Sequence, residues 1–170
     1  TPKPSSAASD VYKRQYEINI RARHGLALWT HLMKAGAEFG ITPYGTEAMH
    51  VLRAEKGFII VGQETDGSVT PQDLGMDWIV SKVKPDFIGK RALERASMAA
   101  DNRKQLVGLR TKERKQVIPE GAHAVLDPNQ PMPMDMLGQV TSSYYSPNVG
   151  SSIAMAMLKG GRALMGGTVY

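Results

Sequence analysis

The sequence predicts an α+β fold in which a helix-rich portion precedes a small antiparallel β-barrel. Between residues 24 and 57 the apolar residues recur at helical spacing and the segments end on glycine, as packed helices do. From residue 104 onward, short apolar runs alternate with Gly, Pro, Asn and Asp, which is typical of antiparallel barrels and sandwiches. An all-β fold is the second possibility.

The first elements are expected to be one strand and two helices. Apolar and polar residues alternate over residues 16–21, which indicates a strand. A helix is expected over residues 24–40, because its apolar positions are three and four apart and a glycine ends it. A second helix is expected over residues 42–56, since it opens on Thr-Pro and is followed by a glycine.

The next segment is expected to contain two short helices and one strand. Thr70 and Pro71 repeat the Thr-Pro start signal, and Asp73 stands three residues after the capping threonine. A glycine follows quickly, so this helix must be short. Residues 78–83 have the pattern of a strand, and another short helix is expected within residues 86–93.

The barrel is expected to be built from short strands separated by turn residues. The apolar runs that indicate these strands cover residues 106–111, 123–127, 136–143, 151–158 and 162–170. Because the last of them stops within a strand pattern, we expect the barrel to be truncated at its end.

Three regions are predicted along the chain. We expect residues 1–15 to be a non-native, disordered tail, because they lack apolar periodicity and SSAASDVYKRQ resembles the translation of an adapter used in DNA library preparation. Residues 16–84 form the helix-rich portion and residues 85–170 the barrel. The tail carries two of the five net positive charges, so the basic character of the chain belongs partly to it.

The composition excludes several classes of function. The chain has no cysteine, which rules out disulfides, thiolate metal ligands and thiol nucleophiles. No apolar run approaches the length of a membrane span. Three Phe, two Trp and six Tyr are too sparse to interleave with a basic stripe as nucleic-acid binding requires. We therefore expect a cytoplasmic protein with neither membrane nor nucleic-acid partners.

No metal site is expected. The histidines lack the spacing of metal ligands, and no cluster of carboxylates accompanies them. Neither a glycine-rich phosphate loop after a strand nor a nucleophile elbow is present. The histidines concerned are His24, His31, His50 and His123.

Two polar groups of residues remain as candidates for chemistry. Arg53 and Glu55 stand at the end of the second expected helix and diverge from each other. Gln63, Glu64 and Asp66 stand in the connection that follows. The residues alone favour a solvated helix face and a turn, with a catalytic role as the alternative.

An ordered series of motifs resembles a known family. The residues that carry the resemblance are Leu52, Arg53, Glu55 and Gly57, then Gly62, Gln63 and Glu64, Thr70 and Pro71, Gly75, Trp78, and Asp86, Phe87, Ile88 and Gly89. LVGL at residues 106–109 and GQVTSSYYSPNVGSSIAMAML at residues 138–158 continue it. Together they resemble the folate-binding aminomethyltransferases, the family of the T-protein of glycine cleavage, over residues 16–170.

The resemblance implies a fold and a cofactor. Residues 16–84 would be the C-terminal portion of the folate-binding aminomethyltransferase fold, and residues 85–170 its C-terminal β-barrel. Tetrahydrofolate is the implied cofactor, with Tyr16, Met49, Arg53 and Glu55 in the wall of its pocket. The catalytic aspartate of the family would precede residue 1, so we expect no catalytic residue within this chain.

Within the family, the chain is similar to the branch of the sarcosine oxidase alpha subunits, with which it shares Met49 where glycine-cleavage T-proteins carry arginine. That branch implies transfer of a one-carbon unit from oxidised sarcosine to tetrahydrofolate, giving methylene-tetrahydrofolate, glycine and peroxide. FAD or FMN and NAD would be bound elsewhere in the complex. The implied partners are the beta, gamma and delta subunits, and this chain alone is expected to be inactive.

Two alternatives accompany this hypothesis. One is a folate-binding or scaffolding domain without catalysis of its own. The other is the folate-dependent branch that assists iron–sulfur and tRNA-modification pathways, but Phe58 stands where that branch carries a cysteine. Under the favoured hypothesis, residues 63–66 shape a loop, and either Arg53 or Glu55 is buried and bonded to neighbouring groups.

Overall fold

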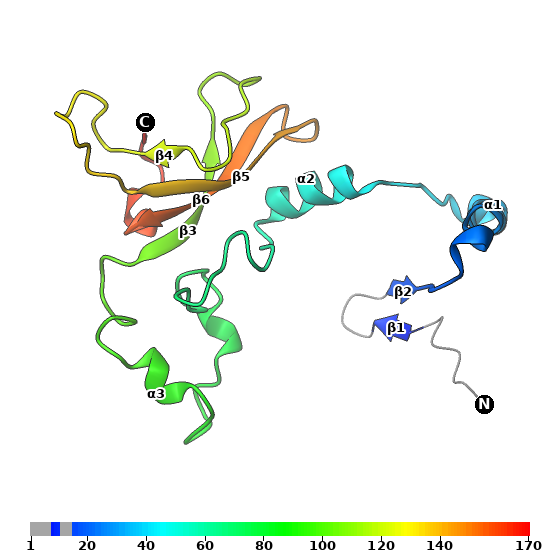
Figure 1. The fold of residues 1–170 in the computed structure, drawn as a ribbon, viewed down its shortest axis with the longest axis horizontal. Coiled ribbons are helices and arrows are strands. Elements are labelled where there is room, and N and C mark those ends of the chain that lie inside the picture. Colours follow the sequence, from blue (N-terminus) through cyan, green and yellow to red (C-terminus); the bar gives the residue numbers. More distant parts are fainter. Residues whose placement is uncertain (1–7, 11–14) are drawn as a thin grey trace. The chain divides into compact units, whose positions relative to one another are not determined.

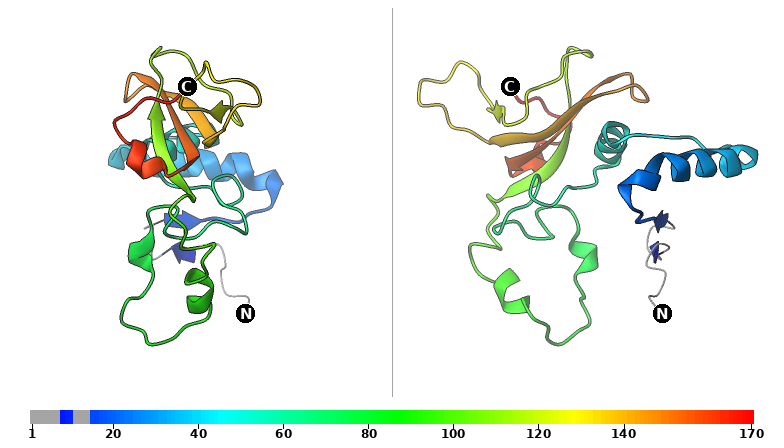
Figure 2. Two further views of the ribbon diagram at one scale, coloured as in Figure 1. Left: turned by 90° about the vertical axis from the view of Figure 1, so that its left-hand side faces the viewer. Right: turned by 45° about the vertical axis from the view of Figure 1, so that its right-hand side comes forward.

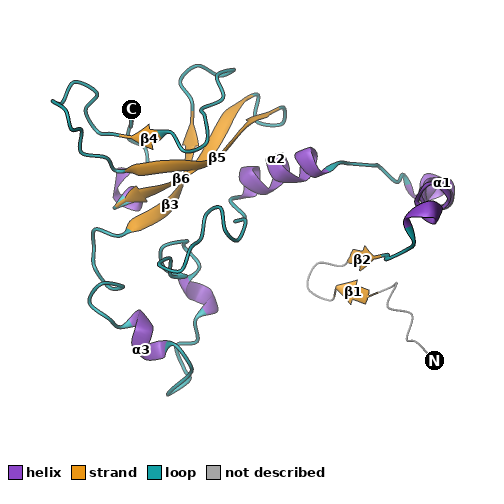
Figure 3. Cartoon of the chain, viewed as in Figure 1, coloured by secondary structure: helices purple, strands orange, loops and turns teal. Residues whose placement is uncertain are grey.

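The structure, a computed structural model, describes residues 8–10 and 15–170 and divides the chain into two compact units, Thr1–Tyr44 and Gly45–Tyr170. Figure 3 shows helices in both units and a curled antiparallel sheet in the second. The predicted α+β class is therefore confirmed. No helix in these described stretches combines the length and the apolar character that crossing a bilayer demands.

The first unit begins with a two-stranded antiparallel sheet. Strand β1 (Ala8–Asp10) pairs with β2 (Gln15–Glu17), so the segment predicted to be disordered contains regular structure at these residues. The pairing joins backbone groups, which is why the absence of apolar periodicity does not prevent it. The rest of the predicted tail lies outside the described residues. The strand expected over residues 16–21 already ends at Glu17.

The helix predicted for residues 24–40 is present in the first unit. A 3₁₀ turn, η2 (Ala22–His24), leads into helix α1 (Gly25–Gly36), which continues as a second 3₁₀ turn, η3 (Ala37–Phe39). Gly40 ends it at a φ of 68°, a left-handed conformation that glycine adopts without a steric penalty.

Helix α2 (Thr46–Lys56) opens the second unit. It begins four residues later than predicted, with Gly45 as its N-cap and no side-chain capping bond, and the Thr42 hydroxyl donates a hydrogen bond to the Gly40 carbonyl at 3.3 Å. Its predicted end is confirmed. Gly57 adopts a φ of 76° and donates its N–H to the Ala54 carbonyl at 3.1 Å, while the next N–H returns to the carbonyl of residue 53.

The segment between α2 and the sheet contains only short helical pieces. The strand predicted for residues 78–83 is wrong, since a 3₁₀ turn, η4 (Asp77–Ile79), stands there and pairs its backbone groups locally. The short helix expected in residues 86–93 is present as α3 (Lys90–Leu93). The helix expected after Thr70 is only a turn.

The second unit contains a four-stranded antiparallel sheet in the order β3-β6-β5-β4 (Figure 1). Its strands are β3 (Lys104–Arg110), β4 (His123–Ala124), β5 (Gly138–Ser146) and β6 (Ser151–Lys159). The last predicted strand is largely wrong, because a 3₁₀ turn, η5 (Gly161–Leu164), replaces its beginning. Its final residue, Tyr170, nevertheless exchanges two backbone hydrogen bonds with Val125, at 2.7 and 2.9 Å.

The sheet has an apolar inner face and a more polar outer face. On the inner face, Ala124, Ala156 and Leu158 form the buried cluster, against which further apolar side chains from β3 and the chain end pack. Neighbouring residues of a strand face opposite sides, so Met155 lies on the outer face. Helix α2 lies beside β5 and β6 on that side (Figures 1 and 2).

Gly138 at the start of β5 leaves no room for a side chain. A Cβ atom there would lie 1.9 Å from the Met157 carbonyl oxygen on the neighbouring strand. The two longest strands can therefore approach closely only because this position is glycine.

Candidate functional site

Arg53 joins the end of α2 to the outer face of the sheet. Only 9% of the residue is exposed. Its Nη2 donates to the hydroxyls of Ser142 at 2.5 Å and Tyr144 at 3.2 Å. Its Nη1 donates to the Phe58 carbonyl at 3.2 Å and lies 3.1 Å from Glu64 Oε1. The expectation that either Arg53 or Glu55 is buried is confirmed at Arg53, and the solvated helix face that the residues alone favoured is wrong at this position.

Glu64 is the buried counter-ion of Arg53. It is 1% exposed, and its carboxylate accepts the Ile60 N–H at 2.7 Å and the Ser142 hydroxyl. Burial alone raises the pKa of Glu64, but the bonds from Ser142, Ile60 and Arg53 outweigh it and hold the pKa below its ordinary value. The pair is therefore ionised at neutral pH.

The turn that the residues alone indicated is present at residues 62–64, but Glu64 within it is buried. The family motif pointed to Arg53, and a buried guanidinium requires a carboxylate within reach, but nothing in the sequence selects Glu64 as that carboxylate. Gln63 contributes as well, donating from Nε2 to the Thr141 carbonyl at 2.7 Å. These contacts give the loop the shaping role that the resemblance led us to expect.

Glu55 ties the other side of α2 to the β5–β6 hairpin. Its Oε1 accepts the Ser146 hydroxyl at 2.5 Å, and both carboxylate oxygens accept from Asn148 Nδ2, at 3.2 and 3.1 Å. The hydrogen bonds from Ser146 and then Asn148 lower the pKa of Glu55. Arg53 and Glu55 thus diverge as predicted and fasten one helix at two points.

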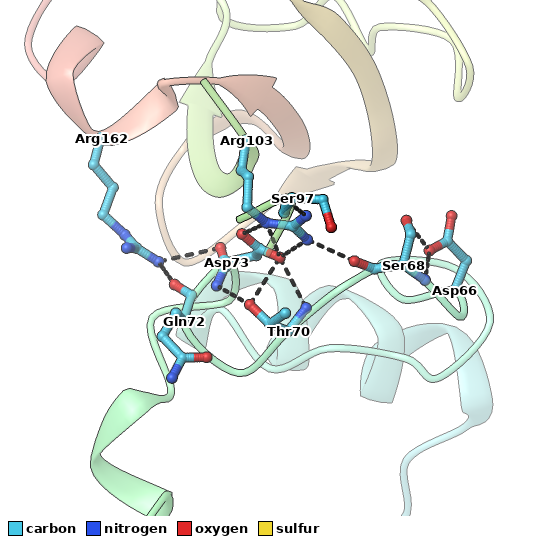
Figure 4. A network of polar contacts seen from close by, with 8 residues as sticks. All are labelled: Asp66, Ser68, Thr70, Gln72, Asp73, Ser97, Arg103 and Arg162. Carbon is cyan, nitrogen blue, oxygen red and sulfur yellow. Dashed lines mark hydrogen bonds and ion pairs between the residues drawn. The ribbon is translucent and has the colours of Figure 1, made fainter. Parts of the chain in front are cut away.

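A second buried ion pair lies below the sheet (Figure 4). Asp73, which is 4% exposed, accepts the N–H of Thr70 at 2.8 Å and its hydroxyl at 2.9 Å. Arg103 donates from Nε to Asp73 Oδ1 at 2.9 Å, and its remaining N–H groups reach the carbonyls of Ser68 and Ser97, at 2.5 and 2.9 Å. The network joins the loop at residues 68–73 to the chain entering β3.

The Thr70–Asp73 pair forms the capping contacts predicted from the sequence, although no helix follows. The Asp73 N–H donates to the Thr70 hydroxyl at 3.3 Å, in addition to the two bonds that run the other way. Burial raises the pKa of Asp73, but the bonds from Arg103 and Thr70 outweigh it, so the pKa is lowered. Arg162 and the Leu106 N–H hold the Asp73 carbonyl, at 3.1 and 2.8 Å.

The other predicted wall residues are exposed. Tyr16 belongs to the first unit and is 73% exposed, whereas Met49 on α2 is 47% exposed. Arg53 and Glu55 instead have their charged atoms bonded within the chain. In the second unit, the buried carboxylates of Glu64 and Asp73 are each matched by a guanidinium, so neither is available as an acid or base at neutral pH.

Comparison with known proteins gives the chain a family. Residues 11–84 match the GCVT N-terminal domain, and residues 104–170 match the glycine cleavage T-protein C-terminal barrel domain. The chain belongs to the glycine cleavage T-protein family. The first match begins inside residues 1–15, and the non-native origin of that segment stays a prediction.

Several curated relatives are similar over most of the chain. It is 52% identical over 155 residues to the sarcosine oxidase subunit alpha of Corynebacterium sp. (strain P-1), covering 89% of this chain and 16% of that protein. It is 41% identical over 147 residues to that subunit of Rhizobium meliloti (strain 1021), covering 86% and 15%. It is 33% identical over 154 residues to an aminomethyltransferase of Halothermothrix orenii, covering 91% and 41%. The chain thus spans about a sixth of the first two relatives.

The described residues fit only part of the folate site that the family implies. Tyr16 and Met49 offer exposed aromatic and thioether surface of the kind that packs against a flat ring. Arg53 and Glu55 do not fit as direct polar anchors, because their bonds are satisfied within the chain except for the buried Arg53 Nε. Any folate site therefore needs polar groups beyond these four residues.

Acid is expected to weaken the second unit through Glu64 and Asp73. Both folded-state pKa values are lowered, so their contribution to stability is complete above the unfolded pKa values of about 4 and is lost as the pH falls through the folded values. The thermal midpoint, measured from about pH 7 to about pH 2, should fall below about pH 4. A Glu64→Gln/Asp73→Asn variant should have a lower thermal midpoint at about pH 7, and its midpoint should fall less as the pH is lowered to about pH 2. An equally steep acid loss in that variant would contradict this assignment.

Proposed function

We propose that the chain is the folate-site portion of a sarcosine oxidase alpha subunit. The observation that carries the proposal is the 52% identity to such a subunit, against 33% to an aminomethyltransferase. In this proposal the longer protein oxidises the N-methyl group of sarcosine, with dioxygen as the final electron acceptor that is reduced to peroxide. The one-carbon unit then passes to tetrahydrofolate, which gives methylene-tetrahydrofolate and glycine. Tetrahydrofolate supplies the nitrogen nucleophile that captures the carbon.

The residues of this chain would then contribute surface to the folate site and support it, Tyr16 from the first unit and the other three predicted wall residues from the second. Tyr16 and Met49 would supply wall surface, since both side chains are exposed. Arg53 and Glu55 would hold the wall from behind, because each bonds α2 to the barrel. A rigid wall favours binding, since fewer side chains lose freedom when the ligand arrives.

The proposal includes partners that this chain does not itself contain. The beta, gamma and delta subunits would complete a cytoplasmic heterotetramer. FAD or FMN and NAD would be bound elsewhere in the complex, since oxidation of an N-methyl group requires a hydride acceptor and the sequence has no dinucleotide-binding fingerprint. This chain alone would therefore be inactive.

The test is turnover of sarcosine by the purified chain and by the complex. We expect no peroxide or formaldehyde from residues 1–170, with or without tetrahydrofolate. A full-length alpha subunit that includes this sequence, co-expressed with its partner subunits, should produce peroxide, and added tetrahydrofolate should suppress free formaldehyde. Turnover by residues 1–170 alone would contradict the proposal, as would a complete complex that fails to oxidise sarcosine.

A folate-binding or scaffolding domain without catalysis is the second candidate. The internal bonding of Arg53 and Glu55 favours it, because both residues serve the packing of α2. Quenching of tryptophan fluorescence by tetrahydrofolate in the full complex discriminates the two. Under the favoured proposal, Met49→Glu should both weaken folate binding and raise formaldehyde release. If the chain is only a scaffold, folate affinity and formaldehyde release in Met49→Glu should equal those of the parent complex.

A further inference from the structure

A polar side chain that none of the preceding assignments uses lies directly beside Met49. His50 is the next residue of α2 and is half-buried. No hydrogen bond from its imidazole to another described residue is found. Arg53 and Glu55, by contrast, are bonded within the chain. Among these helix residues, His50 therefore has the polar atoms that are open to a ligand.

Met49 and His50 border the same strip of the helix surface. Residues three and four apart on a helix are neighbours, so both lie one turn before Arg53. Their side chains leave the helix about 100° apart, because a turn takes about 3.6 residues. Arg53 itself points into the sheet, where it bonds to Ser142 at 2.5 Å. A flat bicyclic ring that packs on Met49 is wide enough to bring its edge to His50.

Tyr144 holds the imidazole of His50 from the side of the sheet. It belongs to β5 and is half-buried. The centroids of the two rings lie 6.4 Å apart and their planes are tilted by 44°, a geometry in which aromatic rings attract one another. This contact limits the orientations of the imidazole and uses neither of its nitrogens for a hydrogen bond.

Arg53 in turn fixes the position of Tyr144. Its Nη2 donates to the Tyr144 hydroxyl at 3.2 Å, and its guanidinium carbon lies 5.7 Å from the centroid of the tyrosine ring. The same guanidinium is paired with the buried Glu64. The contacts thus lead from a buried ion pair through Tyr144 to His50. A ligand-binding side chain needs rigid support of this kind to hold its orientation.

We propose that His50 binds folate and that Tyr144 is the residue that positions it. The inference rests on the proposed function and assigns His50 to the polar edge of the pterin ring that packs on Met49. An imidazole nitrogen donates or accepts a hydrogen bond, and the edge of a pterin offers both kinds of partner. Tyr144 does not touch the folate. It restricts His50 beforehand, so less side-chain freedom is lost on binding.

The test uses the full-length alpha subunit that contains this sequence, co-expressed with its partner subunits. His50→Phe keeps an aromatic ring beside Tyr144 but has no hydrogen-bonding atom. The affinity for tetrahydrofolate, measured by quenching of tryptophan fluorescence, should therefore fall about tenfold. His50→Gln keeps a polar amide and should bind within about threefold of the parent. Equal losses in the two variants, or no loss in His50→Phe, would overturn the proposal.

The matched control is His123→Phe, which makes the same substitution at an exposed residue of β4. Its affinity for tetrahydrofolate should stay within about twofold of the parent. In His50→Phe, the tetrahydrofolate concentration that halves the release of free formaldehyde should rise about tenfold, whereas suppression at saturation should be as complete as in the parent. A loss of affinity in His123→Phe as large as that in His50→Phe would overturn the proposal.

A double-mutant cycle tests the positioning role of Tyr144. Tyr144→Leu should weaken tetrahydrofolate binding by about threefold, because His50 loses its support, and Tyr144→Phe should weaken it less, because the ring remains. In a His50→Phe background, Tyr144→Leu should change the affinity by less than about twofold, since Tyr144 acts through His50. Losses that multiply independently would overturn the positioning role.

The outcome for His50 is distinguishable from the outcome for the proposed function. A parent complex that oxidises sarcosine and binds tetrahydrofolate, with unchanged affinity in His50→Phe, would overturn the role of His50 and leave the proposed function in place. A parent complex that does not bind tetrahydrofolate would overturn both.

Discussion

Replacing Arg53 with alanine is expected to lower the free energy of unfolding of the second unit by about 3–5 kcal/mol. The substitution leaves the Glu64 carboxylate buried and without its guanidinium, and it also removes the bonds to Ser142 and Tyr144. Because an unpaired charge in the interior costs more than the pair itself contributes, the loss should exceed that of an ordinary surface substitution. Urea unfolding followed by circular dichroism measures it.

The matched control is the exposed ion pair between Lys159 and Asp135, whose atoms lie 3.6 Å apart and whose side chains are 49% and 90% exposed. Lys159→Ala should cost only about 0–1 kcal/mol. The double variant Arg53→Met/Glu64→Leu should recover much of the loss, because it removes both charges together. An Arg53→Ala protein as stable as its parent would refute the structural role of this ion pair.

The helices were the most predictable part of the fold, since their signals are local. Apolar residues at helical spacing predicted α1 and α2, and the glycines that follow them fixed where both helical segments end. Those ends depend on a left-handed backbone that glycine adopts without steric cost, so they follow from the residue itself. The predicted start of α2 was wrong, because threonine followed by proline occurs in turns as well as at helix starts.

The strands were less predictable because a strand needs a partner. Residues 78–83 have the composition of a strand, but they form a 3₁₀ turn and bends instead, so propensity alone did not decide their structure. The same limit applies to the site. Glu64 and Ser142 are 78 positions apart, and nothing in the spacing of either indicates that they meet. The family resemblance pointed to Arg53, and only the three-dimensional structure supplied its counter-ion.

Substitution of Asp73 with alanine should have the second large effect, again about 3–5 kcal/mol. The change leaves Arg103 without its carboxylate and frees both the N–H and the hydroxyl of Thr70. Arg103→Ala should cost less, about 2–3 kcal/mol, because the Asp73 carboxylate keeps its two bonds from Thr70 and Arg103 is more exposed than Asp73.

The relative stability losses of Asp73→Ala and Arg103→Ala test how the ion pair between Asp73 and Arg103 holds the loop. If Asp73 organises the loop by capping Thr70 as well as by pairing with Arg103, then Asp73→Ala must be more destabilising than Arg103→Ala. The loss of stability in Asp73→Asn should lie between those of Asp73→Ala and Arg103→Ala, because the asparagine amide oxygen can still accept a bond from Thr70. Amide hydrogen exchange at Thr70 and Leu106 should rise in Asp73→Ala, whereas in Arg103→Ala it should rise less at Thr70. Equal destabilisation by Asp73→Ala and Arg103→Ala, with equal exchange at Thr70, would show that the ion pair alone holds the loop to the barrel.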